Sequence, residues 1–75
     1  MRELAKAFLA QGKTVRAAAL MMNLIKTEPT PENLELLAEI YTQQGLYEDA
    51  AVLYLRVVKM GLNEAIDKRG GAAVS

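Results

Sequence analysis

The sequence predicts an all-α fold of two antiparallel helical hairpins that stack on each other, followed by a short C-terminal helix. Three observations lead to this prediction. Apolar residues recur at helical spacing along most of the chain, glycines interrupt the pattern, and the pattern returns after a fixed shift. A chain of 75 residues forms one small domain, expected here over residues 1–69. We divide it into a first hairpin over residues 1–29 and a second over residues 30–62.

The first hairpin begins with a helix expected over residues 2–11, because its apolar residues share one face. These residues are Leu4, Ala5, Phe8 and Leu9. Gly12 follows, where a left-handed residue commonly ends a helix. Thr14 is then expected to cap a second helix over residues 15–26. That helix is apolar almost all round, so we expect it to be buried on several sides.

The second hairpin begins after Pro29, which disfavours further helix at the preceding residue. Thr30 and Pro31 suit the cap and the first turn of a third helix, expected over residues 31–44. The inner stripe of this helix consists of Leu34, Leu37, Ala38, Ile40 and Tyr41, with Leu36 at its margin. Gly45 is expected to end the helix in the way that Gly12 ends the first one.

The fourth helix is predicted over residues 47–60 and is expected to end at Gly61. Asn63 then stands where it could cap a short C-terminal helix, and this last element is predicted over residues 63–69. Residues 70–75 are mostly small, and we expect them to form a flexible tail.

The two hairpins are related by a shift of 33 residues, which places Gly12 on Gly45 and Ala17 on Ala50. The other matching pairs are Leu4 and Leu37, Ala5 and Ala38, Phe8 and Tyr41, Met21 and Tyr54, Leu24 and Val57, and Ile25 and Val58. The alanines are small enough to let antiparallel helices approach closely, and the glycines permit a positive φ in a tight turn. A period of this length indicates stacked helix pairs.

At these positions the chain resembles the tetratricopeptide repeat (TPR) family. The second hairpin carries the resemblance in a Leu-Leu-Ala-x-x-Tyr run that ends at Tyr41, followed by Gly45, Tyr47, Ala50 and Tyr54. The resemblance covers about residues 1–63. It implies a right-handed α-solenoid, in which the first helix of each repeat lines a concave groove that binds an extended or helical peptide.

Carried onto this chain, the resemblance implies a protein-binding groove with a basic first half and an acidic second half. Its residues are Arg2, Lys6, Leu9, Glu32, Glu35, Glu39, Thr42 and Gln43. Matching positions in the two repeats place Arg2 beside Glu35 and Lys6 beside Glu39. These charges either face a partner or neutralise each other, for about 0–1 kcal/mol per pair. The sequence leaves both interpretations open.

Composition argues against catalysis and against nucleic-acid binding. The chain has no cysteine and no histidine, so it lacks the groups of the common nucleophilic sites. Nine basic and nine acidic residues balance, whereas nucleic-acid binders usually carry a basic excess. Glu35 and Glu39 lie one turn apart on a polar face, which is typical of a solvated surface. We therefore expect no enzymatic activity, no cofactor and no metal site.

The sequence also predicts no direct insertion into a membrane. The longest apolar run, residues 17–22, is far shorter than the roughly 20 residues that span a bilayer. The charged N-terminus lacks the apolar segment of a signal peptide. A cytoplasmic location is the expectation that follows.

The leading functional interpretation is a non-catalytic scaffold or adaptor that binds a protein or peptide partner through the groove. Self-association into a homo-oligomer is the first alternative. The apolar second helix and its counterpart in the second repeat carry more apolar residues than the core of one repeat needs. The candidate contacts are Leu20, Met22 and Leu55. A secretion or export chaperone for a small helical client is a second alternative.

Overall fold

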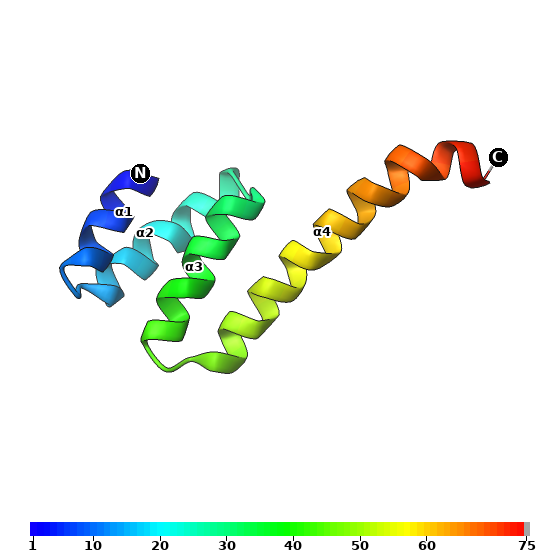
Figure 1. Ribbon diagram of the computed structural model, residues 1–75. Helices are drawn as coiled ribbons and strands as arrows, with labels where there is room; N and C mark the ends of the chain where they lie inside the picture. Colours follow the sequence, from blue (N-terminus) through cyan, green and yellow to red (C-terminus); the bar gives the residue numbers. More distant parts are fainter. Residues whose placement is uncertain (75) are drawn as a thin grey trace.

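The computed structural model describes the backbone of residues 1–74 and the side chains of residues 1–64. The all-α prediction is confirmed, since the described part of the chain contains helices and no strand. The helices are α1 (Arg2–Ala10), α2 (Thr14–Thr27), α3 (Pro31–Gln43) and α4 (Tyr47–Val74) (Figure 1). Each helix packs chiefly on its neighbours in sequence, α1 on α2, α2 on α3 and α3 on α4.

The turns of the two hairpins have the same backbone hydrogen bonds at matching positions. Gly12 and Gly45 adopt positive φ values of 77° and 80°. In the first turn, the Gly12 N–H donates to the Leu9 carbonyl oxygen at 3.0 Å, and the Lys13 N–H donates to that of Phe8 at 2.8 Å. The matching bonds run from Gly45 to Thr42 at 3.0 Å and from Leu46 to Tyr41 at 2.9 Å. This bond pair is the Schellman motif, which satisfies the last carbonyls of a helix.

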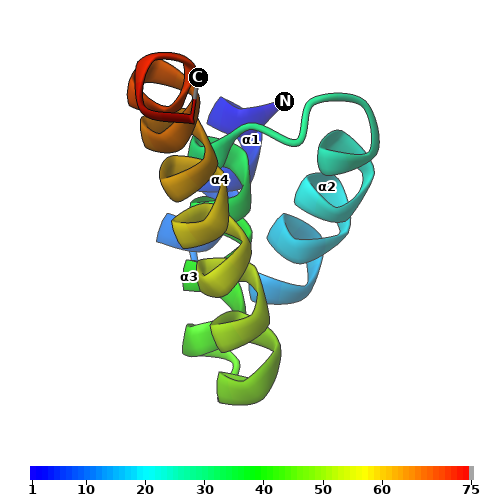
Figure 2. The ribbon, with the colours of Figure 1, turned by 90° about the vertical axis from the view of Figure 1, so that its right-hand side faces the viewer.

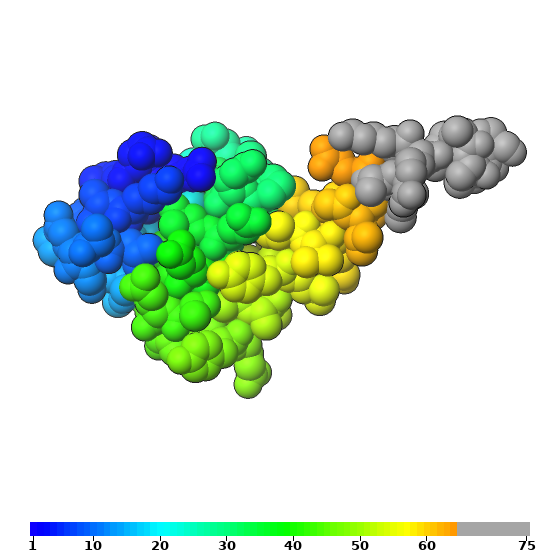
Figure 3. Space-filling model, in the orientation of Figure 1, coloured from blue at the N-terminus to red at the C-terminus, as the bar shows by residue number. Residues whose placement is uncertain are grey.

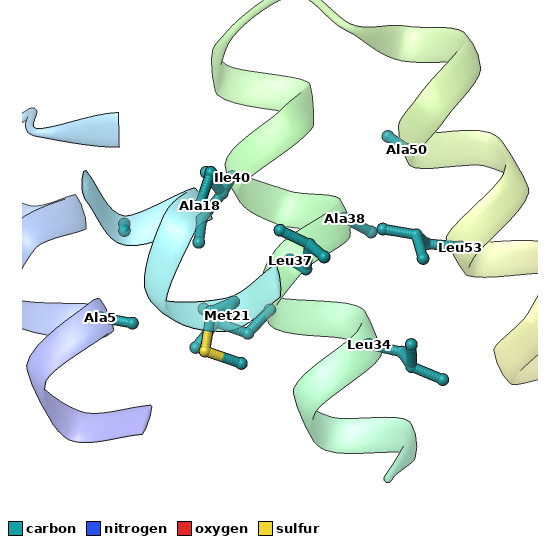
Figure 4. Close-up of a cluster of buried hydrophobic side chains, with 11 residues drawn as sticks. Ala5, Ala18, Met21, Leu34, Leu37, Ala38, Ile40, Ala50 and Leu53 are labelled. Carbon is teal, nitrogen blue, oxygen red and sulfur yellow. The ribbon is translucent and has the colours of Figure 1, made fainter. Parts of the chain in front are cut away.

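The core has alanines at the closest helix contacts and larger side chains around them. Ala5 and Ala17 are buried in the first hairpin, and their counterparts Ala38 and Ala50 are buried in the second. In the close-up, Ala38 of α3 points toward Leu53 of α4 (Figure 4). The largest fully buried side chains are Met21, Leu34, Leu37 and Ile40. Because most of these lie on α3, that helix is the centre of the packing.

The linker between the hairpins is held by the first turn of α3. The Thr30 side chain accepts a hydrogen bond from the Asn33 N–H at 3.2 Å, and Pro31 is the first helical residue, as predicted. Asn33 is a buried polar residue, and its burial does not follow from the sequence pattern. Its Nδ2 donates to the Glu28 carbonyl oxygen at 2.9 Å. This bond fixes the start of α3 against the end of α2.

Two predictions about α2 are wrong. Lys13, not Thr14, occupies the N-cap position, and no side chain caps this helix. The helix is also not buried on several sides, because Val15 and Met22 are 74% and 49% exposed. Its buried residues are Ala17, Ala18 and Met21. Helices α1 and α3 pack on the side that carries these residues and leave the opposite side open.

The predicted break at Gly61 is also wrong, because α4 runs unbroken from Tyr47 to Val74 and leads away from the other helices (Figure 1). Gly61 does not adopt the positive φ that ends the first helix of each hairpin. Residues 63–69 are therefore part of α4 rather than a separate short helix. The helix also includes residues 70–74 of the expected tail, and Ser75 lies outside the described residues.

Replacing Gly45 by alanine is expected to lower the free energy of unfolding by about 1 kcal/mol or more, since a Cβ atom is strained at this φ. Gly61→Ala is the matched control. A Cβ atom meets no neighbouring heavy atom within 4 Å at either position, so steric contact does not distinguish them. Alanine at helical position 61 should raise the free energy of unfolding by roughly 0.5–1 kcal/mol. Urea unfolding followed by circular dichroism measures both changes, and effects of the same sign would contradict this account.

Two neighbouring methionines test the placement of the core. Met21 is fully buried, whereas Met22 is 49% exposed. Met21→Ala is expected to lower the free energy of unfolding by about 2–5 kcal/mol through the cavity that it leaves. Met22→Ala should lower it by less than about 1 kcal/mol. The denaturation midpoints of the two variants measure these changes. Equal decreases in the free energy of unfolding would mean that the buried face of α2 is assigned wrongly.

Candidate functional site

Five of the eight predicted groove residues line one hollow in the surface. This hollow has a volume of about 350 Å³. Its lining residues are Arg2, Lys6, Glu32, Glu35, Leu36, Glu39 and Tyr54. We term it the charged groove. Figure 3 shows the contributing helices on one face of the molecule, with α1 in blue, α3 in green and the first part of α4 in yellow.

Helical spacing places the charges on opposite walls of the charged groove. Arg2 and Lys6 lie about one turn apart on α1 and form its basic wall. The acidic wall on α3 consists of Glu32, Glu35 and Glu39. The carboxylates recur at spacings of three and four residues, so they share one face of that helix. Leu36, which is buried, and Tyr54 of α4 add apolar surface between and beside the walls.

The charges of the groove are not joined in direct ion pairs. Among the side chains of residues 1–64, no lysine or arginine nitrogen lies within 4.0 Å of a carboxylate oxygen. The expected neighbours Arg2 and Glu35, and Lys6 and Glu39, therefore line one hollow without contacting each other. The Arg2 Nε is buried and has no hydrogen-bond acceptor within this part of the chain. A bound carboxylate or carbonyl oxygen could satisfy this donor.

Three predicted groove residues do not line the hollow. Leu9 is partly buried and packs against the core. The Thr42 hydroxyl donates to the Ala38 carbonyl oxygen at 2.9 Å, one turn back on its own helix. Gln43 is exposed at the end of α3. The charged groove is therefore confined to the part of α1 and α3 nearest to the linker between the hairpins.

A neighbouring hollow extends the charged surface toward the linker. It has a volume of about 380 Å³ and shares Arg2 and Glu32 with the charged groove. Its other lining residues are Met1, Leu24, Glu28, Thr30 and Asn33. A bound segment that follows both hollows would thus pass over Arg2 at the point where they meet.

A larger hollow, which the sequence does not predict, lies where α2, α3 and α4 meet. It has a volume of about 620 Å³ and a mostly apolar lining. The lining residues are Ala19, Met22, Asn23, Ile25, Lys26, Leu37, Tyr41, Leu53 and Arg56. The one signal for it in the sequence is the wide apolar surface of α2. Its extent could not be predicted, because it depends on the angle at which α2 and α4 cross α3.

The three residues proposed for self-association lie in different surroundings. Leu20 is partly buried and packs against the core. Met22 is half exposed and lines the 620 Å³ hollow. Leu55 is 52% exposed on α4 and lines neither this hollow nor the charged groove. Self-association through these three residues stays a prediction.

The described part of the chain contains neither a membrane-spanning helix nor a metal site. No helix there combines the length and the apolar composition that crossing a membrane requires. No group of three or more histidine, cysteine, aspartate or glutamate side chains there is placed to hold a metal ion.

Comparisons with known proteins do not assign a family. The chain matches no family model, no curated protein and no solved structure. The resemblance to the TPR family therefore rests on the residues and on the 33-residue shift, and it stays a prediction.

Proposed function

We propose that this protein is a non-catalytic, TPR-like interaction module whose charged groove binds a segment of a partner protein. The observation that carries the proposal is the pair of oppositely charged walls on α1 and α3, which line one hollow without ion pairs of 4.0 Å or less among residues 1–64. The repeated turn and the buried alanines at matching positions support two stacked repeats. In such an arrangement the groove is preformed, which lowers the entropic cost of binding.

The chemistry of the groove specifies the kind of segment that fits. The acidic wall favours lysine or arginine side chains opposite Glu35 and Glu39, whereas Arg2 favours a carboxylate or a carbonyl oxygen. Leu36 and Tyr54 offer apolar contact between these points. Complementary charges at both walls set the direction in which a segment lies and raise the rate of encounter.

Peptides selected from a random library on the wild-type protein test this proposal. We expect the selected peptides to be rich in basic residues and to bind less tightly as the salt concentration rises. The double variant Glu35→Lys with Glu39→Lys should bind them at least about tenfold more weakly, because two attractive contacts become repulsive. Fluorescence anisotropy measures the affinities, and circular dichroism verifies that both exposed substitutions leave the fold intact.

The matched control is the double variant Asp49→Lys with Glu64→Lys. It makes the same change in net charge at exposed positions of α4 that do not line the groove. Its affinity for the selected peptides should stay within about twofold of the wild type. The proposal is wrong if the groove variant keeps wild-type affinity, or if both double variants lose affinity equally.

A further inference from the structure

Helix α4 carries a second apolar face that no other described part of the chain covers. One face of α4 packs on α3 through Ala50, Leu53 and Val57. The second, which we term the open face, consists of Tyr47, Ala51, Tyr54, Leu55, Val58 and Leu62. All six residues are exposed. Among the five large side chains, the exposed fraction ranges from 42% for Tyr54 to 68% for Tyr47. Figure 2 looks toward α4 with α3 behind it.

The first hairpin shows that a face of this kind packs against a helix. Ala18, Met21 and Ile25 on α2 precede Ala51, Tyr54 and Val58 by 33 residues each. Ala18 and Met21 are 6% and 0% exposed, and Ile25 is partly buried, in a helix on which α3 packs. The matching residues of α4 have the same apolar character and no such cover among residues 1–64. The open face therefore has the character of a helix-binding surface, and no helix among residues 1–64 covers it.

A head-to-tail stack of copies does not supply a suitable helix. In such a stack, α1 of the next copy would take the place that α3 takes on α2. The buried residues Leu36 and Ile40 of α3 correspond to Glu3 and Ala7 of α1. A carboxylate and a single methyl group would then face an apolar surface, which is unfavourable for the charge and leaves the surface poorly filled.

The open face is complementary to itself. We propose that two copies of this chain form a dimer in which their α4 helices pair antiparallel, about a twofold axis that passes between residues 52 and 53. This register places Ala51 opposite Tyr54 of the partner subunit, and Tyr47 opposite the partner subunit's Val58. The small Ala51 then faces the large Tyr54, and the long Tyr47 faces the shorter Val58, so the two surfaces can pack closely. Leu55 comes to lie beside Val52 of the partner subunit, and both of these residues are more than half exposed in the single chain.

Charges beside the open face favour the antiparallel direction. Glu48 and Lys59 lie along the same edge of this face, near its two ends, and both are exposed. In the proposed register, each Glu48 lies within about 3 Å along the helix axis of the level of Lys59 of the partner subunit. The twofold axis forms this pair twice, whereas a parallel pair would bring like charges together. A net charge of zero adds little repulsion between copies.

Sedimentation equilibrium of the full chain over a wide concentration range tests the dimer. The wild-type mass is expected to rise to twice the 8.2 kDa of one chain. Val58→Glu, which puts a charge into the open face, should raise the dimer dissociation constant by about a hundredfold or more. Val15→Glu is the matched control, because it makes the same change at an exposed position of α2 outside this face. It should leave the dissociation constant unchanged.

A charge exchange tests the register. Glu48→Lys and Lys59→Glu are each expected to raise the dissociation constant by about fivefold, and the double variant should return to within about twofold of the wild type. Circular dichroism verifies that each variant is folded. A wild-type chain that stays monomeric would overturn the inference. The open face would then be covered by a helix of another protein or by no helix. A double variant as weak as the single ones, or loss of the dimer in Val15→Glu, would overturn the inference as well.

The dimer and the function proposed above share one residue, Tyr54, which belongs to the open face and also lines the charged groove. Val58, Glu48 and Lys59 do not line the charged groove, so Val58→Glu removes the dimer and leaves the lining of the groove unchanged. The expected result for this variant is loss of dimerisation with a peptide affinity that is retained or increased, because the dimer no longer covers Tyr54. A variant that loses the dimer and also loses peptide binding would contradict the groove proposal and leave the dimer inference standing.

Discussion

Both hairpins depend on a positive φ at one glycine each, Gly12 and Gly45. With this conformation, two N–H groups just past the helix reach back to its last carbonyls, and the next helix begins after a connection of three residues. So short a connection forces the paired helices to lie side by side. Their nearest positions then require small side chains, and buried alanines occupy them in both hairpins. The larger apolar residues fill the space around these contacts.

The sequence predicts the elements whose signals are local. Thr30 and Pro31 mark the start of α3 because both act on the backbone of its first turn. The prediction fails at Gly61 because glycine permits a left-handed end but does not impose one. No proline follows Gly61, and the next residues are compatible with a helix, so the hydrogen bonds of α4 continue through it. Glycine alone is therefore an incomplete signal for the end of a helix.

The candidate site could be predicted only within single helices. Spacing along the chain decides which residues share a face, so it predicts the basic pair on α1 and the acidic row on α3, and both sets line the charged groove. Which residues meet across helices depends on crossing angles and side-chain reach. Tyr54 lines the groove from α4, and Leu9 turns to the core instead, and neither follows from spacing. The apolar hollow between α2 and α4 could not be predicted for the same reason, because it also depends on the angles at which the helices cross.

The basic wall of the charged groove belongs to the helix with the weakest attachment. Helix α1 packs chiefly on α2, and Ala5 is its one buried residue. A helix that is held by one main neighbour and one buried side chain can detach locally at a smaller free energy than global unfolding requires. A partner held by Arg2 and Lys6 also holds α1 in its docked state, so the observed affinity is the intrinsic affinity scaled by the docked fraction.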